Sequence, residues 1–208
     1  MSNEGAGQVF IVAAPSGAGK TSLVRALISE MPGIVMSISH TTRDPRPGEN
    51  NGEHYHFIDL DTYQAMVDQG EFLEHAQVHG NGYGSSRGEV RRAAERGLDL
   101  VLEIDWQGAQ QAKKLIPDAR SIFILPPSRA ELAKRLRSRA QDSDEVIARR
   151  LAGAVAEMRH WDEFDFLVVN DEFDKALEQL KTIIRACRLS RPAQTPRLAP
   201  LLKDLLGG

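Results

Sequence analysis

The sequence predicts an α/β fold in which a parallel β-sheet core is covered by helices on both faces. The first observation is the apolar, β-branched run Val9-Phe10-Ile11-Val12-Ala13, which is typical of a buried strand and precedes a glycine-rich loop and a helix. The second is that short apolar runs alternate with amphipathic stretches along the chain, as in a parallel sheet. The third is the length of 208 residues, which suits one such domain with insertions.

The composition narrows the classes of partner. A net charge of −3 gives no general attraction to nucleic acids or anionic membranes, so we expect neither as a partner. The chain has no 18-residue apolar run, which argues against a membrane-spanning helix. Cys187 is the only cysteine, so no internal disulfide can form, in agreement with a cytoplasmic location.

The first half of the chain contains a change of pattern. A helix over 22–28 and a strand at 34–39 are expected to follow the first strand. His40–Glu49 then holds two prolines, two arginines and no apolar residue, which predicts a loop. Strands at 55–58 and 71–78, a helix over 62–69 capped by Asp61, and a turn at 80–84 come next. These short elements predict a small mixed α/β insertion that stands off the main sheet.

Strands and helices alternate again in the second half. We expect helices over 89–96, 107–115, 129–139, 145–162 and 174–189, and strands at 98–105, 121–125 and 166–169. Ser128 is the expected N-cap of the helix over 129–139, and the polar segment 140–144 is expected to be mobile. The proline-rich stretch 192–200 predicts irregular structure, with a helical turn over 201–206.

These elements divide the chain into parts. A flexible tail over 1–7 precedes one domain over 8–190, and a C-terminal tail over 191–208 follows it. Within the domain we expect a core (8–38, 87–134 and 165–190), an insertion (39–86) and a helical lid (135–164).

A Walker A loop lies between the first strand and the first helix. Gly17 and Gly19 allow the backbone to turn tightly around an anion, and the helix N-terminus adds its positive dipole end. Lys20 is expected to reach the β- and γ-phosphates and the Thr21 hydroxyl to bind Mg²⁺, mostly through phosphates and water. Ala14 stands where the motif has its first glycine, and the alternative interpretation is a chance glycine-rich turn. The residues expected to contact ATP here are Ala14, Pro15, Ser16, Gly17, Ala18, Gly19, Lys20, Thr21 and Ser22.

Further motifs indicate a family. The chain carries Ser37-Ile38-Ser39-His40-Thr41-Thr42-Arg43-Asp44-Pro45-Arg46-Pro47-Gly48-Glu49, then Gly52, Tyr55 and Glu74, then Tyr83-Gly84-Ser85, then Glu103-Ile104-Asp105-Trp106-Gln107-Gly108. From about Val9 to Leu189 it resembles bacterial guanylate kinases, which transfer a phosphoryl group from ATP to GMP with Mg²⁺ in purine nucleotide metabolism. The resemblance implies a phosphate-loop core, a GMP-binding insertion and a mobile lid.

Two arginines of the insertion suit the phosphate of GMP. Arg43 and Arg46 are three residues apart on a proline-stiffened loop, where two guanidinium groups can grip one phosphate dianion. Tyr55 and Tyr83 can add hydroxyl donors. In the resembling family the equivalent positions hold the GMP phosphate.

Carboxylates suit the base of GMP. Guanine presents N1–H and an N2 amino group, and one carboxylate accepts from both, whereas adenine presents an acceptor at N1. By resemblance Glu74 reads the base, with help from Asp105, Ser39 and Ser85. Glu103 is also grouped with the GMP-binding residues. Because Glu103 and Asp105 end a predicted strand, either of them can support Mg²⁺ through water. The division of labour between them is open.

Arginines flank the polar segment 140–144. A lid that brings positive charge onto the transferring phosphoryl group stabilises the transition state and excludes water. The resemblance selects Arg139 and Arg150 as catalytic residues beside Lys20, and Arg135 and Asn170 as ATP-binding residues. Ala140 replaces the glycine that the family has at the hinge.

Two alternatives were weighed against an active kinase. Guanylate-kinase-like modules that bind peptides in the GMP cleft commonly lose the phosphate-loop lysine or the lid arginines, and this chain keeps Lys20, Arg139 and Arg150. A phosphate-loop kinase for another small substrate fits Glu74, Ser39 and Ser85 less well. The six histidines show no metal-ligand spacing and are interpreted as surface or loop residues. The oligomeric state is open, with a homodimer as one alternative.

Overall fold

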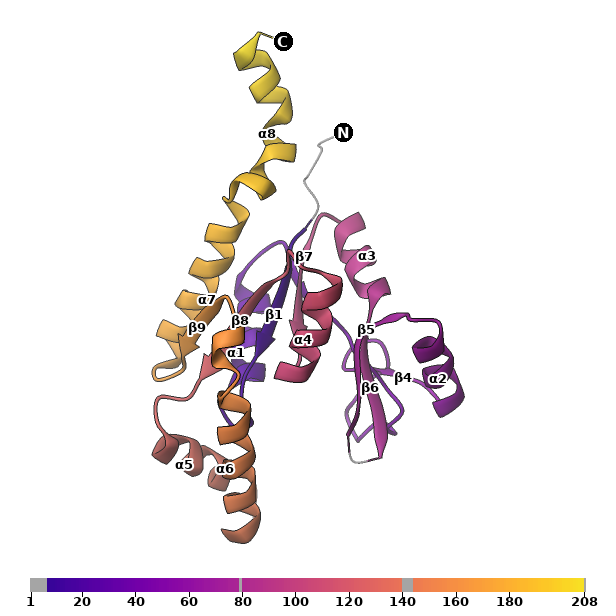
Figure 1. Ribbon diagram of the computed structural model, residues 1–208, viewed down its shortest axis with the longest axis vertical. Helices are drawn as coiled ribbons and strands as arrows, with labels where there is room; N and C mark the ends of the chain where they lie inside the picture. The colour runs from indigo at the N-terminus through magenta and orange to yellow at the C-terminus, as the bar shows by residue number, and fades with distance from the viewer. Residues whose placement is uncertain (1–6, 79, 140–143, 208) are drawn as a thin grey trace.

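The computed structural model describes residues 7–78, 80–139 and 144–207, and its largest element is a parallel sheet (Figure 1). The five strands have the order β2-β7-β1-β8-β9, and every neighbouring pair is parallel. Their bounds are β1 Val9–Ala13, β2 Ile34–Met36, β7 Asp99–Glu103, β8 Arg120–Leu125 and β9 Phe166–Val169. The helices around them are α1 Lys20–Glu30, α3 Arg87–Glu95, α4 Trp106–Leu115 and α7 Phe173–Arg188.

The central strand β1 explains why helices cover both faces. Phe10 and Val12 are fully buried in a cluster that includes apolar residues of α1 and α7. Ile11, whose side chain points the other way because strand residues alternate, is buried in a second cluster with residues of α3 and α4. The predicted fold class, a parallel sheet with helices on both faces, is confirmed.

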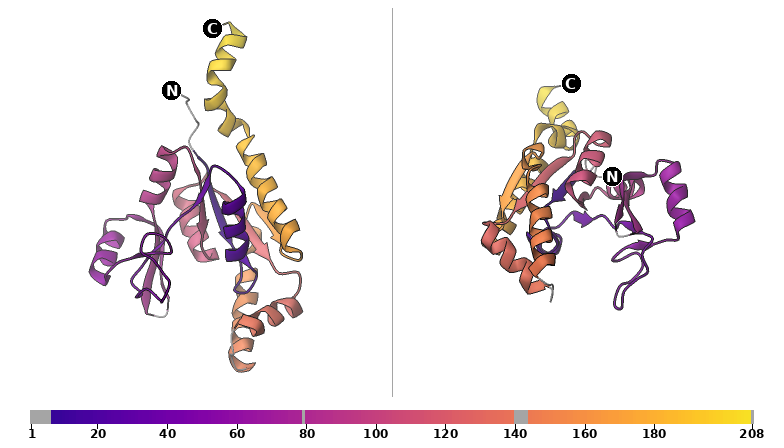
Figure 2. Two further views of the ribbon diagram at one scale, coloured as in Figure 1. Left: turned by 180° about the vertical axis from the view of Figure 1, so that it is seen from behind. Right: turned by 60° about the horizontal axis from the view of Figure 1, so that its bottom comes forward.

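A second, smaller sheet lies beside the first (Figures 1 and 2). Its strands are β3 His40–Thr41, β4 His56–Phe57, β5 Phe72–Val78 and β6 Asn81–Ser86, in the order β4-β3-β6-β5. The β5–β6 and β3–β6 pairs are antiparallel, and β3 and β4 are parallel. Helix α2 (Leu60–Asp68) packs on this sheet through the buried Tyr63.

The predicted turn at 80–84 is wrong, because residues 81–86 form strand β6. A Cβ on Gly82 would lie 2.6 Å from the Tyr63 ring, and a Cβ on Gly84 would lie 2.7 Å from the Phe72 ring. These glycines therefore let two aromatic rings pack directly on the strand backbone, and what the sequence suggested as a turn is a packing surface. The predicted loop 40–49 is also interrupted at its start, where His40 and Thr41 form β3.

Several predicted boundaries shift, two of them at the N-terminal caps of helices. Asp59, not Asp61, caps α2 by accepting a hydrogen bond from the Thr62 amide at 2.6 Å. The strand predicted at 98–105 ends at Glu103 because Asp105 caps α4, and the strand predicted at 34–39 ends at Met36. Ser128 caps α5 (Arg129–Arg139) as predicted, with 3.0 Å from its Oγ to the Glu131 amide.

In the lid region α5 has the predicted bounds, 129–139, whereas the second predicted helix is divided. The helix predicted over 145–162 is α6 Asp144–Met158, followed by a separate 3₁₀ helix, η1, at Trp161–Glu163. Residues 140–143 of the predicted mobile segment, and residues 1–6 of the predicted N-terminal tail, lie outside the described residues.

The prediction of irregular structure over 192–200 is wrong. Residues Arg191–Leu206 form one helix, α8, which projects from the rest of the molecule (Figures 1 and 2). Pro196 and Pro200 lie within it four residues apart, so the missing N–H groups fall on one side of the helix. In the described ranges neither this helix nor any other is long and apolar enough to cross a membrane.

Candidate active site

The loop between β1 and α1 is held by backbone geometry and by one distant side chain. Gly17 and Gly19 have φ of +91° and +93°, the left-handed region that glycine adopts without strain. A Cβ on Gly19 would lie 2.4 Å from Asn170 Nδ2, which itself donates a 2.7 Å hydrogen bond to the Ala18 carbonyl. Asn170 is only 6% exposed. It therefore holds the loop in shape, a role that its position after the last strand had not indicated.

Lys20 and Thr21 begin α1 and point at groups of strand β7 and its C-terminal end. The Lys20 ammonium donates a 2.7 Å hydrogen bond to the Ile104 carbonyl, and the Thr21 hydroxyl donates to Glu103 Oε1. Burial lowers the pKa of Lys20, and the nearby carboxylates, Glu103 foremost, act in the opposite direction. In the absence of nucleotide, both groups expected to serve phosphate and Mg²⁺ have partners within the protein.

Glu157 is a further protein group that contacts the phosphate loop, and the sequence did not predict this contact. Its Oε2 accepts a hydrogen bond from the Ser16 amide at 3.0 Å, which places a carboxylate of α6 against the phosphate loop. Burial raises the pKa of Glu157, with a further contribution from Asp105. No motif surrounds Glu157 in the sequence, so only the approach of α6 to the loop identifies it.

The residues expected to read the base lie together on the small sheet. Glu74 of β5 is 9% exposed and faces Ser85 across the β5–β6 pair. Burial raises the pKa of Glu74, and hydrogen bonding to Ser85 partly offsets that effect. The Ser39 and Ser85 hydroxyl oxygens are 3.2 Å apart. A buried carboxylate beside two hydroxyl groups can accept and donate hydrogen bonds at the edge of a purine.

The N-terminus of α4 lies directly against Glu74. Asp105 accepts a 2.8 Å hydrogen bond from the Gly108 amide and so caps the helix. A Cβ on Gly108 would lie 3.1 Å from Glu74 Oε2, so a larger residue would displace the carboxylate. Gly108 was part of the quoted motif, but its packing against Glu74 was not foreseen.

The phosphate-binding candidates of the insertion are brought together only in part. Arg43 Nη2 pairs with both oxygens of Glu49 at 3.0 and 2.9 Å, and its Cζ is 5.6 Å from the centre of the Tyr55 ring. The Tyr55 and Tyr83 ring centres are 6.0 Å apart. Within the described residues the Arg46 guanidinium makes no hydrogen bond or ion pair, although its amide donates to Glu49. The Arg43 guanidinium is therefore paired with the Glu49 carboxylate, an ion pair that the sequence did not predict.

A cleft lies between the core and the insertion. A cavity of about 520 Å³ is lined by Thr21 and Glu103 from the core and by Ser39 and Tyr55 from the insertion. The magnesium-site candidates and two of the GMP-site candidates therefore face the same space.

The lid helices contact the phosphate loop from the other side. Arg135 of α5 donates to the Asn170 carbonyl at 3.1 Å, so these two ATP-site candidates are adjacent. A Cβ on Gly17 would meet Leu136 at 2.9 Å, and Leu136 packs with Ala154 of α6. Arg139 ends α5 and Arg150 lies partly buried on α6.

The interpretation of the histidines as surface or loop residues holds for His54, His75 and His160 but not for His40 and His56. His40 and His56 lie on β3 and β4 with ring centres 4.6 Å apart, and His160 stacks on Trp106 at 3.5 Å. Burial and the neighbouring His56 lower the pKa of His40 to about 4. Aromatic packing, which leaves no trace in residue spacing, accounts for the difference.

Comparison with known proteins identifies the family. The guanylate kinase family model matches residues 6–187. Curated guanylate kinases from Alkalilimnicola ehrlichii and Escherichia coli K12 are each 55% identical, over 97% and 96% of this chain and 99% and 98% of theirs. The crystal structure of guanylate kinase from Anaplasma phagocytophilum is 31% identical, with a TM-score of 0.72 over 96% of this chain and 95% of that one. These findings do not support the alternative of an inactive peptide-binding module. The chain belongs to the guanylate kinase family, nucleoside monophosphate kinases that transfer a phosphoryl group from ATP to GMP.

Proposed function

We propose that the ATP phosphates bind at the phosphate loop, that GMP binds on the small sheet, and that the phosphoryl group crosses the cleft between them. The observation that carries this assignment is the 520 Å³ cleft, which has Thr21 and Glu103 on one side and Ser39 and Tyr55 on the other. Phosphoryl transfer needs positioning and positive charge more than covalent chemistry. A cleft between a phosphate loop and a base-reading sheet supplies the positioning and the positive charge.

On the core side, the amides of residues 14–22 and the N-terminus of α1 would hold the ATP phosphates. Lys20 would leave the Ile104 carbonyl and pair with the β- and γ-phosphates, and Ser16 would exchange Glu157 for a phosphate oxygen. Arg135 and Asn170 line the adjoining edge, where the nucleoside of ATP would lie.

Mg²⁺ fits the chemistry of the residues beside the loop. The Thr21 hydroxyl and the Glu103 carboxylate are hard oxygen donors already in contact, which suits an ion that binds few protein ligands and keeps phosphates and water. Among the described residues no three His, Cys, Asp or Glu side chains gather as a metal site, so phosphates and water would complete the coordination. The ion would neutralise charge on the phosphate oxygens.

On the insertion side, Arg43, Arg46, Tyr55 and Tyr83 would bind the phosphate of GMP. Arg43 would exchange Glu49 for that phosphate, because a dianion offers the same bidentate acceptor geometry with more charge. Arg46, whose side chain has no hydrogen bond or ion pair in the described structure, would join it when GMP arrives.

The base of GMP would lie against Glu74. Its carboxylate would accept from guanine N1–H and N2–H, with Ser39 and Ser85 beside it and Asp105 fixing the end of α4. Adenine would leave this buried carboxylate facing a lone pair, an arrangement that costs several kcal/mol. Glu103, which accepts a hydrogen bond from Thr21, would line the same cleft.

The lid helices would close on the reacting phosphoryl group. Arg139 and Arg150, on α5 and α6, would add positive charge to its oxygens and exclude water. We further propose that the enzyme works in the cytoplasm in purine nucleotide metabolism and GMP recycling, since ATP and GMP are its substrates.

A coupled assay tests the assignment. With ATP and Mg²⁺, GMP should be phosphorylated far faster than AMP, CMP or UMP, and chelation of Mg²⁺ should abolish turnover. Equal rates with AMP would contradict the role of Glu74, and undiminished turnover after chelation would contradict the Mg²⁺ site.

A further inference from the structure

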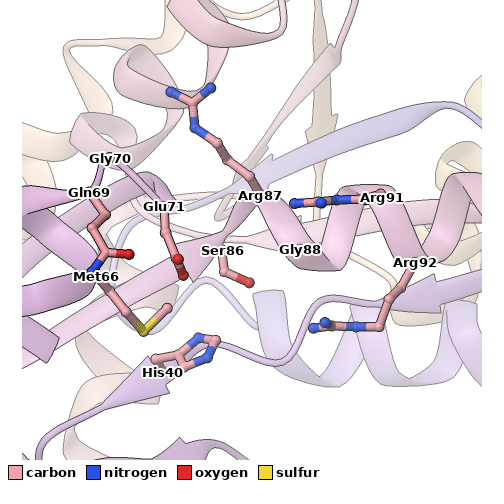
Figure 3. A pocket seen from close by; sticks show the side chains of 10 residues that line it. All are labelled: His40, Met66, Gln69, Gly70, Glu71, Ser86, Arg87, Gly88, Arg91 and Arg92. Atoms are coloured by element: carbon pink, nitrogen blue, oxygen red, sulfur yellow. The ribbon is translucent and has the colours of Figure 1, made fainter. Parts of the chain in front are cut away.

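A hollow on the opposite side of β6 from Ser85 takes no part in the proposed reaction. Its volume is about 560 Å³, and it is lined by residues of α2, β3, β6 and the first turns of α3 (Figure 3). Ser85 faces Glu74, so Ser86 points to the other side because strand residues alternate. None of the residues that line the hollow is among those proposed to bind ATP or GMP.

Arginine is the commonest charged residue around the hollow. Arg87, Arg91 and Arg92 line it together with one acidic residue, Glu71. Arg92 pairs with Glu89, whereas the side chains of Arg87 and Arg91 make no hydrogen bond or ion pair in the part of the chain that the structure describes. In Figure 3 the Arg92 side chain reaches toward His40 and Ser86, and Arg87 points away.

Ser86 supplies an unpartnered, buried hydroxyl. The residue is 5% exposed and occupies the N-cap position of α3, yet its side chain makes no capping hydrogen bond. Figure 3 shows it pointing into the hollow. The hydroxyl has no protein partner within the described residues, so it is available to donate to a ligand in the hollow.

Gly88 keeps the space in front of this hydroxyl open. A Cβ on Gly88 would lie 3.2 Å from Arg92 Nη1 and 3.5 Å from Ser86 Oγ, so a side chain there would fill the cradle between them. The Arg87 amide donates to the Glu71 carbonyl at 2.8 Å, whereas the other amides of the first helical turn have no acceptor within the helix and carry its positive dipole end. A hydroxyl, a guanidinium and helix amides thus converge where glycine leaves room for an anion.

We propose that this hollow is a second phosphate site, which binds a small phosphorylated molecule that also carries hydroxyl donors. The phosphate lies in the cradle formed by Ser86, Gly88 and Arg92, and Arg91 pairs with it from the rim. The Glu71 carboxylate opposes a bare anion but accepts a hydrogen bond from a ligand hydroxyl. The volume is that of ordinary small-molecule sites.

The experiment uses the full chain with its active site saturated by GMP, Mg²⁺ and a non-hydrolysable ATP analogue. Inorganic phosphate and ribose 5-phosphate are titrated separately while the Gly88 amide is followed by NMR. We expect saturable shifts at Gly88 with both probes and tighter binding of ribose 5-phosphate. Arg91→Ala and Ser86→Ala should each weaken phosphate binding, Arg91→Ala by about tenfold, because a charge-assisted hydrogen bond is lost.

Two variants give the test its specificity. Arg96→Ala makes the same charge change near the end of α3, outside the hollow, and should leave phosphate affinity unchanged. Glu71→Gln should strengthen binding of inorganic phosphate and reduce the advantage of ribose 5-phosphate. Absence of a saturable Gly88 shift in the wild type overturns the proposal, as do equal losses in Arg91→Ala and Arg96→Ala. Full phosphate affinity in a folded Ser86→Ala protein also contradicts the proposed cradle. The dispersion of the amide spectrum shows whether each variant is folded.

Discussion

The phosphate loop and the small sheet face one cleft but present different kinds of chemical group to it. The loop presents backbone amides, and its shape is fixed by two left-handed glycines and by the hydrogen bond from Asn170 to Ala18. The small sheet presents side chains, which are held by pairs such as Arg43 with Glu49 and Ser39 with Ser85. A backbone site tolerates many neighbouring side chains, whereas a side-chain site depends on each residue in it.

The two regions also differ in what supports them. The phosphate loop is anchored in apolar clusters that cover both faces of a five-stranded sheet. The small sheet depends on a few buried aromatic residues, chiefly Tyr63 and Phe72, packed on glycines of β6. Substitutions in the core should therefore affect phosphoryl transfer, and substitutions in the small sheet should affect GMP recognition with little change in ATP binding.

Lys20→Ala tests the core side and should have the largest effect. We expect the loss of about 3 kcal/mol or more of transition-state stabilisation, because the variant removes the ammonium group that we propose to pair with the β- and γ-phosphates. The measurement is kcat/KM for the forward reaction, with Lys114→Ala, an exposed site on α4, as the control for loss of one lysine. Near-wild-type turnover in folded Lys20→Ala protein would remove the phosphate loop from the mechanism.

Gly82→Ala tests whether the small sheet can lose stability and GMP affinity independently of the core. The added Cβ would lie 2.6 Å from the Tyr63 ring, and overpacking of this kind costs about 1–3 kcal/mol. GMP affinity should fall while ATP affinity holds, and hydrogen exchange should rise in β5 and β6 but not in β1. Gly153→Ala, where a Cβ meets open space on α6, should instead stabilise the protein by about 1 kcal/mol. Unchanged exchange in β6 of the Gly82→Ala variant would mean that the sheet repacks freely.

Glu74→Gln tests base recognition without changing the shape of the side chain. The amide accepts one hydrogen bond from guanine but presents a donor to the second, so GMP should lose about 1–3 kcal/mol of binding free energy. The measured quantity is the ratio of kcat/KM for GMP to that for AMP, which should fall mainly on the GMP side. A ratio equal to that of the wild type would show that Glu74 does not read the base.

The pKa of Glu74 adds a stability test to the same variant. Burial raises this pKa, so the ionised carboxyl group lowers the stability of the ligand-free fold as the pH rises above the ordinary glutamate value. Glutamine removes that cost, and the ligand-free variant should melt no lower than the wild type at neutral pH. A lower Tm for the variant would contradict the burial of an ionisable group at this position.

Glu157→Gln should have the smallest effect. In the proposed complex the ATP phosphates take the Ser16 amide from this carboxylate, so its neutral isostere should tighten ATP binding by less than about 1 kcal/mol. Burial raises the pKa of Glu157, so lowering the pH through that value should protonate the wild-type carboxyl group and narrow the difference from the variant. Glu145→Gln, an exposed change on the same helix, is the control. Weaker ATP binding by Glu157→Gln would show that the carboxylate supports the loop.

The elements that were predicted correctly are those whose signal is local. Strand β9 was predicted with its observed bounds, 166–169, and Ser128 caps its helix as expected, because an apolar run and a capping serine act on their neighbours. Strand β6 was missed because Gly82 and Gly84 are turn residues by local preference, and only Tyr63 and Phe72 make them a strand. Helix α8 was missed because Pro196 and Pro200 signal irregular structure wherever they stand.

The sequence by itself determined the α/β core and the phosphate loop, and it predicted four residues that line the cleft, Thr21, Ser39, Tyr55 and Glu103. Those features rest on short-range patterns: a strand, two glycines, a lysine and a helix start within a few residues of one another. The tertiary structure alone decided which groups Lys20, Thr21 and Ser16 contact without a nucleotide, and it alone formed the basic hollow behind β6. Ser16 and Glu157 are 141 positions apart in the chain. A contact over that separation exists only after the chain has folded, since packing of the helices and sheet, not local preference, brings the two groups together.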